Sequence, residues 1–296
     1  MKCIIILSTK SAGSSALQEL FCRFGGARHV RHTRHGEHET LYWTKAASAL
    51  GLPQIKIPDS EVPIARRRAT RELKEFLAAN TDDFTPPDAL QDIVVAGWHA
   101  LCRTYSPIFV EKSPHHLHQS ACLQLMLNAA EKLGDVDFRY VGLVRNPMDV
   151  LYSAWTRWRT TPESIQHHWK TAYDNLLSLR EVAGDRLTIV RYEDLATKPG
   201  TASALLTTIG LDRTSDGAGS FFYSTSRSKW RSDPAFGFCL DSDVAQTAFR
   251  LGYTEADIRN VGNRTWPLTR TIGRTRNLLV TRPIAAARRT LRRYTR

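Results

Sequence analysis

The segment CIIILSTKSAGSS at residues 3–15 decides the fold of this chain. Its five apolar, largely β-branched residues predict a buried parallel strand, and a helical pattern with one apolar face follows from Ala16 after a loop of small residues. A strand, a loop and a helix in this order can cradle a phosphate group, because the first N–H groups of the helix and its dipole attract an anion. Gly13 would let the backbone approach that anion, and Lys10 would add positive charge.

The loop does not match the Walker pattern GxxxxGK[ST], because its lysine, Lys10, precedes the glycine, Gly13. This order argues against a nucleoside triphosphatase. The run KSAGSS at residues 10–15 resembles the 5′-phosphosulfate loop of sulfotransferases that use 3′-phosphoadenosine 5′-phosphosulfate (PAPS), in which KTAGTS is a familiar form. An ordinary strand–loop–helix corner with a surface lysine is the alternative for this segment taken alone.

The composition is that of a globular protein, with 296 residues and a hydrophobic content of 42%. The net charge is +12, but nine arginines and no acidic residue lie between Leu268 and Arg296, so most of the positive charge belongs to this tail. The charge therefore does not indicate a nucleic-acid-binding protein. A helix opened by Pro283 is expected in the tail, either solvated or in peripheral contact with an acidic membrane or partner.

The five cysteines are scattered and form no CxxC pair, which is typical of a reducing compartment. The apolar start at residues 3–7 is too short for a signal-peptide core, and no apolar run is long enough to cross a bilayer. We expect a cytoplasmic protein, with the basic tail as its one candidate contact with the inner face of a membrane.

Further buried strands are predicted at residues 93–96, 107–110, 138–144 and 187–190. Helices are predicted between and around them, at residues 40–50, 61–79, 115–133 and 161–182. This alternation favours a three-layer α/β/α fold with a central parallel sheet, similar to that of P-loop NTPases. We expect one sulfotransferase-like α/β domain over residues 1–267 and a basic, helical C-terminal tail over residues 268–296.

The strongest motif is RNPMDVLYS at residues 145–153. Arg145 leaves the end of a predicted strand, Pro147 begins a helix, and Ser153 lies on its second turn. Arg145 can donate a forked pair of hydrogen bonds to a phosphate, and Ser153 can donate from its hydroxyl. The whole string closely resembles the 3′-phosphate-binding motif of sulfotransferases. The alternative is that Arg145 forms a salt bridge at a helix start.

Three shorter segments also resemble sulfotransferases. EKSP at residues 111–114 is similar to a segment of carbohydrate sulfotransferases whose lysine, Lys112 here, faces the sulfuryl group; a simple Glu–Lys pair is the alternative. RYEDL at residues 191–195 matches a family segment that we interpret as architectural. A late basic loop in the family helps hold the 3′-phosphate, and a plain basic loop is the alternative here. The candidates in that loop are Arg227, Ser228 and Lys229.

The segment from Arg28 to Glu39 is rich in histidine and arginine. Its histidines recur at every third residue, a spacing that does not fit a metal site. We therefore expect either a solvated basic loop or a loop that faces the acceptor. In glycan-type sulfotransferases a glutamate in this region is the general base, and Glu39, which precedes an aromatic pair, resembles that residue. Glu37 and His38 are close competitors, and His35 remains a candidate.

The resemblance implies in-line transfer of the sulfuryl group from PAPS to a hydroxyl or amine, with PAP as product and no metal. A carbohydrate or glycolipid acceptor is expected, and no nucleic-acid partner. Lys10 or Lys112 would stabilise the leaving oxygen, and Arg145 with Ser153 would hold the 3′-phosphate. The 5′-phosphosulfate would be held by Lys10, Ser11, Ala12, Gly13, Ser14, Ser15 and Ala16. A P-loop kinase and a non-enzymatic basic binding protein are the rival hypotheses.

Overall fold

The computed structural model describes residues 1–57, 60–158, 160–211, 221–222, 227–260, 266–276, 279–280 and 283–284. The chain forms two compact units. The first comprises Met1–Val144 and Thr171–Ser224, and the second comprises Arg145–Lys170 and Thr225–Arg296.

A four-stranded parallel sheet is the centre of the first unit. Its strands are β1 (Lys2–Ser8), β2 (Ile108–Lys112), β3 (Asp137–Val144) and β4 (Leu187–Arg191), in the spatial order β2-β1-β3-β4. β1 pairs with β2 through Ile6 and Lys112, and with β3 through Ser8 and Leu143. Because the strands are parallel, the segments that follow them leave from one edge of the sheet. The predicted parallel sheet is confirmed.

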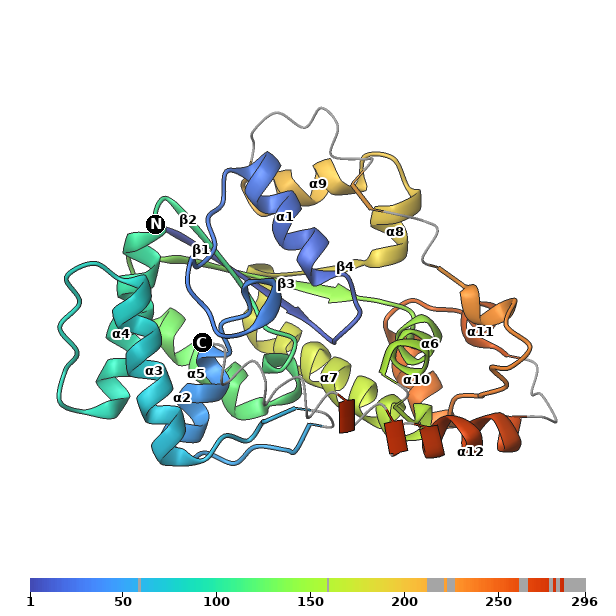
Figure 1. Cartoon of the computed structure of the whole chain (residues 1–296). Helices are drawn as coiled ribbons and strands as arrows, with labels where there is room; N and C mark the ends of the chain where they lie inside the picture. The colour runs from blue at the N-terminus through green and yellow to red at the C-terminus, as the bar shows by residue number, and fades with distance from the viewer. Residues whose placement is uncertain are drawn as a thin grey trace. The chain divides into compact units, whose positions relative to one another are not determined.

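Helices cover both faces of this sheet, as Figure 1 shows, with α1, α8 and α9 on one side and α2 to α5 on the other. The bounds are α1 (Ser14–Gly25), α2 (Tyr42–Leu50), α3 (Arg66–Asn80), α4 (Leu90–Thr104), α5 (Ser120–Lys132), α8 (Tyr192–Thr197) and α9 (Thr201–Thr208). A longer helix, α7 (Pro162–Ala183), begins in the second unit and ends in the first. The predicted three-layer arrangement is confirmed.

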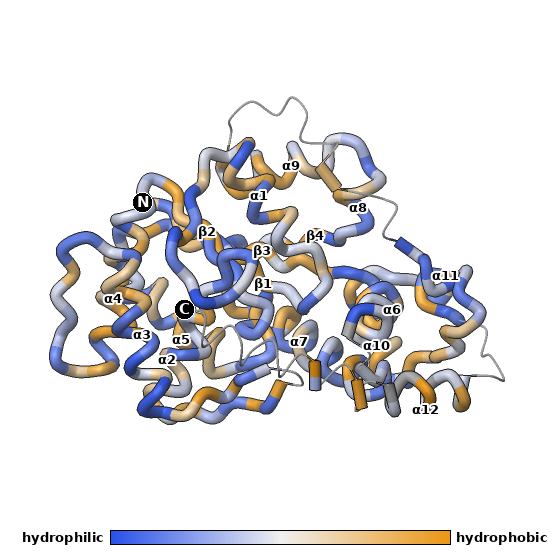
Figure 2. Tube along the Cα trace, in the orientation of Figure 1, coloured by the Kyte–Doolittle hydropathy of each residue, from blue (hydrophilic) through white to orange (hydrophobic). Residues whose placement is uncertain are grey.

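The sheet packs against helices on both of its faces. Ile4 and Ile6 lie in one apolar cluster with Leu17 and Phe21 of α1. On β3, a Cβ atom added to Gly142 would lie 2.8 Å from the side chain of Leu176, so α7 packs directly against that strand. Figure 2 shows hydrophobic and hydrophilic residues alternating along α1 and α4, as expected for helices with one buried face.

The second unit is helical. Its elements are α6 (Pro147–Trp158), the first part of α7, α10 (Ser242–Arg250), α11 (Glu255–Ile258) and α12 (Trp266–Arg276). Aromatic rings join them: the ring centroids of Trp155 and Trp266 lie 5.3 Å apart, and those of Phe236 and Trp266 also lie 5.3 Å apart. This aromatic cluster is the apolar centre of the unit.

One predicted strand is wrong, because residues 93–96 belong to helix α4. Ile93, Val94, Trp98 and Leu101 are all buried, at the spacing of one helix face. A short apolar run has no period of its own, so the residues beyond it decide between helix and strand. The helix predicted from residue 115 begins only at Ser120, after a short 3-10 helix at His116–His118.

The helix predicted at residues 61–79 is α3, which begins at Arg66, and its Leu73, Phe76 and Leu77 are buried. The expected domain boundary at residue 267 falls inside α12. Of the tail helix expected from Pro283, only residues 283–284 are described, and residues 285–296 lie outside the described part. Among the helices that are described, none has the length and apolar character needed to cross a membrane.

Candidate active site

The loop between β1 and α1 has the geometry of an anion cradle. Gly13 adopts φ 98°, and a Cβ atom on it would lie 2.7 Å from ring carbons of Tyr192, so only glycine fits. The N–H of Leu17 donates to the carbonyl of Gly13 at 3.2 Å, so the preceding N–H groups of the first turn have no acceptor within the helix. Tyr192 belongs to the RYEDL segment, which therefore packs against the loop.

Lys112 brings together the start of α1 and the acidic residues of the histidine-rich segment. Its side chain is 1% exposed, and its Nζ donates to Ser15 Oγ at 2.9 Å. The same Nζ lies 3.4 Å from Glu37 Oε2 and 3.7 Å from Glu39 Oε1. Ser15 also donates from its hydroxyl to Glu37. Four residues proposed from the sequence therefore form one cluster at the edge of the sheet.

Glu39 is the more enclosed of the two carboxylates, with 19% of its side chain exposed against 70% for Glu37. Burial raises the pKa of Glu39, while the positive charges of Lys112 and Lys10 act in the opposite direction. Burial dominates, so the pKa of this carboxyl lies above that of an ordinary glutamate. A carboxylate held in this way is a stronger base than an exposed one.

Buried hydrogen bonds hold the backbone next to Glu39. Thr40 Oγ1 and Ser113 Oγ each donate to Glu111 Oε1 at 2.7 Å. The N–H groups of Thr40 and Leu41 donate to Ser113 Oγ at 3.2 and 3.0 Å. The ion pairs of Lys112 thus go to Glu37 and Glu39, whereas its neighbour Glu111 anchors the loop that carries Glu39.

Glu111 is completely buried, and burial alone would raise its pKa. The ring of His116, 3.5 Å away, and the two hydroxyl donors reverse this effect, so the pKa of Glu111 lies below its ordinary value. The carboxyl therefore remains an acceptor for Thr40 and Ser113.

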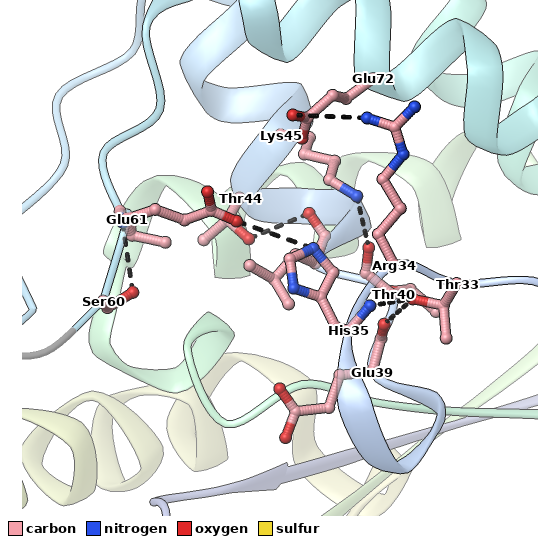
Figure 3. Close-up of polar contacts among 12 residues, drawn as sticks. Thr33, Arg34, His35, Glu39, Thr40, Thr44, Lys45, Ser60, Glu61 and Glu72 are labelled. Atoms are coloured by element: carbon pink, nitrogen blue, oxygen red, sulfur yellow. Dashed lines mark hydrogen bonds and ion pairs between the residues drawn. The ribbon is translucent and has the colours of Figure 1, made fainter. Parts of the chain in front are cut away.

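The two histidine candidates lie in different surroundings. His38 stacks on His29 with ring centroids 3.8 Å apart, and burial, His29 and Lys112 together lower its pKa. His35 Nε2 lies 3.8 Å from Glu61, and burial lowers its pKa. Figure 3 shows His35 beside Glu61, whereas the carboxylate of Glu39 points away from both. His38 therefore lies next to the Lys112 cluster, and His35 belongs to a different polar group.

One residue of this region was missed by the sequence analysis. His115, which follows the EKSP segment, is buried, and its Nδ1 has no hydrogen-bond partner among the described residues. Burial lowers its pKa strongly, and the charge of Lys10 acts in the same direction. The three histidines in HHLH at residues 115–118 were the available signal.

In the second unit, Arg145 precedes α6 and its backbone is fixed. The indole N–H of Trp169 donates to the Arg145 carbonyl at 3.1 Å. Asn146 Oδ1 accepts from the N–H of Met148 at 2.9 Å, and Asn146 Nδ2 donates to the carbonyl of Asp257 at 2.9 Å. Asn146 therefore caps the N-terminus of α6, and Ser153 lies on the second turn of that helix.

The late basic loop, residues 227–229, is hydrogen-bonded to helix α6. The N–H of Ser228, which has φ 53°, donates to Asp149 Oδ1 at 2.7 Å. Arg227 Nε is buried and has no hydrogen-bond partner in the described part of the chain, and Lys229 is exposed. The aspartate of the RNPMDVLYS motif thus holds the segment that carries three of the candidate residues.

Among the residues that the structure describes, one group of side chains could hold a metal ion, namely the exposed His167, Asp241 and Asp243, whose ligand atoms lie within 4.8 Å of one another. Asp241 already accepts a hydrogen bond from Gln166 at 2.7 Å. Exposed acidic groups of this kind are common without a metal, and none of these residues was a sequence candidate.

Comparison with known proteins agrees with the geometry. A sulfotransferase family model matches residues 3–216. The sulfotransferase domain of the Synechococcus PCC 7002 olefin synthase is similar, with a TM-score of 0.55 and 21% identity over 86% of this chain and 95% of that one. The sulfotransferase domain from the curacin biosynthetic pathway has a TM-score of 0.54 and 17% identity, over 85% and 97% of the two chains.

At these identities the two structures show the fold alone. No curated protein matches the chain. The family model covers well over half of the chain and includes the β1 loop, the Lys112 cluster and the RNPMDVLYS motif. The chain belongs to the sulfotransferase family.

Proposed function

We propose that this protein transfers the sulfuryl group of PAPS to a hydroxyl or amine of a carbohydrate or glycolipid acceptor. The observation that carries the proposal is the contact of buried Lys112 with Ser15 of the phosphate loop on one side and with Glu37 and Glu39 on the other. A cation between a phosphate cradle and a candidate base has the chemistry that group transfer to a hydroxyl needs.

The residues of the β1–α1 loop fit a phosphosulfate group. The loop has a glycine at a left-handed backbone angle against Tyr192, N–H groups without an acceptor in the first turn of the helix, and Lys10 as a cation. In this proposal Lys10 and residues 11–16 bind the 5′ end of the donor. Arg145 and Ser153, assisted by Arg227, Ser228 and Lys229, bind the 3′-phosphate. PAPS supplies a sulfuryl group whose bond to the phosphate oxygen breaks during transfer.

Lys112 has two roles in the proposal. Its ammonium stabilises the negative charge that develops on the leaving oxygen, a role that Lys10 can share. Its ion pair with Glu39, at 3.7 Å, also orients that carboxylate. Because Lys112 is buried, its charge is little screened by water, and its effect on nearby oxygens is larger than that of a surface lysine.

Glu39 is the proposed general base, and it accepts the proton of the acceptor hydroxyl. Its enclosed position and raised pKa favour it over the exposed Glu37, which the hydroxyl of Ser15 already engages. The network from Glu111 through Thr40 fixes the backbone beside Glu39, so the carboxylate needs little reorganisation before it accepts a proton.

The test is a transfer assay with radiolabelled PAPS and a panel of acceptors that contains neutral oligosaccharides, acidic oligosaccharides, glycolipid headgroups and flat phenols. Label on a carbohydrate or glycolipid is the expected result. Label on phenols alone would refute the acceptor class but leave the transfer. No label on any acceptor, from protein that binds the PAP product, would show that the acceptor lies outside the panel's chemistry and refute the carbohydrate assignment.

A further inference from the structure

A cavity of about 330 Å³ lies beside the loop that carries Glu39, between that loop, α2 and α3. This volume is within the range of small-molecule sites, roughly 300–1,000 Å³. Its lining includes Arg31, Arg34, Lys45, Glu72, Glu75 and Phe76. All of these residues belong to the first unit.

Lys45 is the unusual residue of this cavity. The residue is 2% exposed, and its Nζ donates to the carbonyl of Thr40 at 3.1 Å and lies 5.5 Å from the centre of the Phe76 ring. No carboxylate of the described residues lies within the 4.0 Å that defines an ion pair with this Nζ. An ammonium has three N–H donors, and within the described residues Lys45 uses one of them for a hydrogen bond, which leaves two for a ligand.

The carboxylates of the cavity are already occupied by arginines. Glu72 Oε1 accepts from Arg68 Nε at 2.6 Å and lies 4.0 Å from Arg34. Glu75 Oε2 accepts from Arg34 at 2.8 Å, and its other oxygen lies 3.7 Å from Arg71. Figure 3 shows Lys45 and Arg34 on one side of the loop, with Glu72 paired to a guanidinium.

Two cations that line the cavity therefore have no acidic partner in the described part of the chain, the buried Lys45 and the exposed Arg31. Burying an ammonium without a counter-ion is unfavourable, and a protein compensates for it with a paired charge. Burial lowers the pKa of Lys45; the charges of Glu72 and Glu61 oppose this effect only in part, and Arg34 and Arg68 reinforce it. An anionic ligand would supply the missing charge.

We propose that this cavity binds an anionic group of the acceptor (a carboxylate, a sulfate or a phosphate ester) at a distance from the hydroxyl that receives the sulfuryl group. The inference rests on the proposed function. Phe76 gives the cavity an apolar wall for the body of the acceptor, and Lys45 with Arg31 binds the oxyanion.

The cavity and the proposed base lie on opposite sides of one backbone segment. Thr33 Oγ1 donates to the carbonyl of Glu39 at 2.5 Å, and Lys45 donates to the carbonyl of the next residue, Thr40. Figure 3 shows the Glu39 side chain pointing away from Lys45. The group bound by Lys45 and the hydroxyl that meets Glu39 are therefore different parts of the acceptor, which favours an acidic oligosaccharide over a single sugar.

The first experiment measures binding with the donor site saturated by 3′,5′-ADP. The probes are glucose and its acidic relatives, glucuronate, glucose 6-sulfate and glucose 6-phosphate. The variant is Lys45→Met, and the control is Lys74→Met, an exposed lysine of α3 outside the cavity lining. We expect at least one acidic sugar, but not glucose, to raise the unfolding midpoint of the wild type and of Lys74→Met, and none to raise that of Lys45→Met.

The outcomes separate the two proposals. If 3′,5′-ADP raises the unfolding midpoint and no acidic sugar raises it further, the cavity proposal is overturned and the proposed donor site is unaffected. No shift with 3′,5′-ADP, together with a shift by acidic sugars that depends on Lys45, would overturn the proposed function and retain the anion site. The 3′,5′-ADP shift of Lys45→Met also reports whether this variant is folded.

The second experiment compares turnover of an acidic and a neutral oligosaccharide acceptor. Loss of a charge-assisted hydrogen bond should raise KM for the acidic acceptor roughly tenfold or more in Lys45→Met, with kcat unchanged. Arg31→Gln should act in the same direction, with Arg67→Gln, an exposed arginine of α3, as its control. Equal losses on the acidic and the neutral acceptor would mean a structural role for Lys45 and would overturn the proposal.

Discussion

Replacing Lys112 by Met removes a cation from the centre of the candidate site while keeping the length of the side chain. Lys112 Nζ lies 3.7 Å from Glu39 Oε1, and at an effective dielectric constant of about 20 two unit charges at that distance attract each other by about 4.5 kcal/mol before desolvation is subtracted. If the same ammonium stabilises the leaving oxygen, its removal should lower kcat by about 10²–10³-fold, the loss typical of one such donor.

The pH profile gives an independent prediction for the same variant. Lys112 lowers the pKa of Glu39, so without it the pKa of that carboxyl rises further above the ordinary value. A general base acts in its ionised form, and the acidic limb of the kcat/KM profile should therefore move to higher pH in Lys112→Met. The profile of wild-type protein and of Lys132→Met, an exposed lysine at the end of α5, should coincide.

The assay is steady-state sulfuryl transfer across the pH range, together with thermal unfolding in 3′,5′-ADP to show that each variant is folded. A loss of kcat smaller than tenfold, in a variant that still binds 3′,5′-ADP, would refute the role of Lys112 in stabilising charge. An acidic limb at the wild-type position would refute the electrostatic coupling of Lys112 with the base.

Three further predictions concern other parts of the first unit. Gly13→Ala should lower the free energy of unfolding, measured with urea, by about 2–5 kcal/mol, because alanine would adopt a left-handed backbone angle and collide with Tyr192. A loss below about 1 kcal/mol would contradict the close approach of Gly13 and Tyr192. Glu39→Gln should abolish most turnover while leaving the 3′,5′-ADP shift unchanged, and Glu37→Gln should retain more activity; the reverse order would make Glu37 the base. Because the pKa of Glu111 is held below its ordinary value of 4.5, the stability that its ionised form contributes is present above pH 4.5 and is lost as the pH falls through its lower folded pKa. In Glu111→Gln the urea midpoint of unfolding should therefore depend less on pH across that acidic range. A midpoint that falls with pH as steeply as in the wild type would contradict the assigned network.

Much of the fold could be predicted from local patterns. The strand and loop at residues 3–15 carry their information within one segment, because a β-branched run, a glycine and a helical period each act locally. The strand predicted at residues 93–96 was wrong because four apolar residues alone show no period. Trp98 and Leu101, which lie beyond the run, are buried on the same face and complete the helical pattern.

The geometry of the candidate site depends on contacts between distant segments, which no local pattern contains. Glu39 differs from Glu37 because of its burial beside Lys112, the last residue of strand β2. Ser228 meets Asp149 although the two are 79 residues apart. The motifs pointed to the segments that carry the candidate residues, but the roles of Glu111 and Asp149 in holding backbone segments became visible only in three dimensions.

Thermal unfolding with 3′,5′-ADP, 5′-AMP and ATP–magnesium tests directly which nucleotide the donor site binds. A ligand that binds only the native state at about 100 times its Kd stabilises it by about 2.7 kcal/mol. We expect 3′,5′-ADP to raise the unfolding midpoint more than 5′-AMP does. This rise should be lost in Arg145→Ala and kept in Arg157→Ala, a variant at an exposed arginine of α6. A shift with ATP–magnesium and none with 3′,5′-ADP would contradict the assignment of PAPS as the donor.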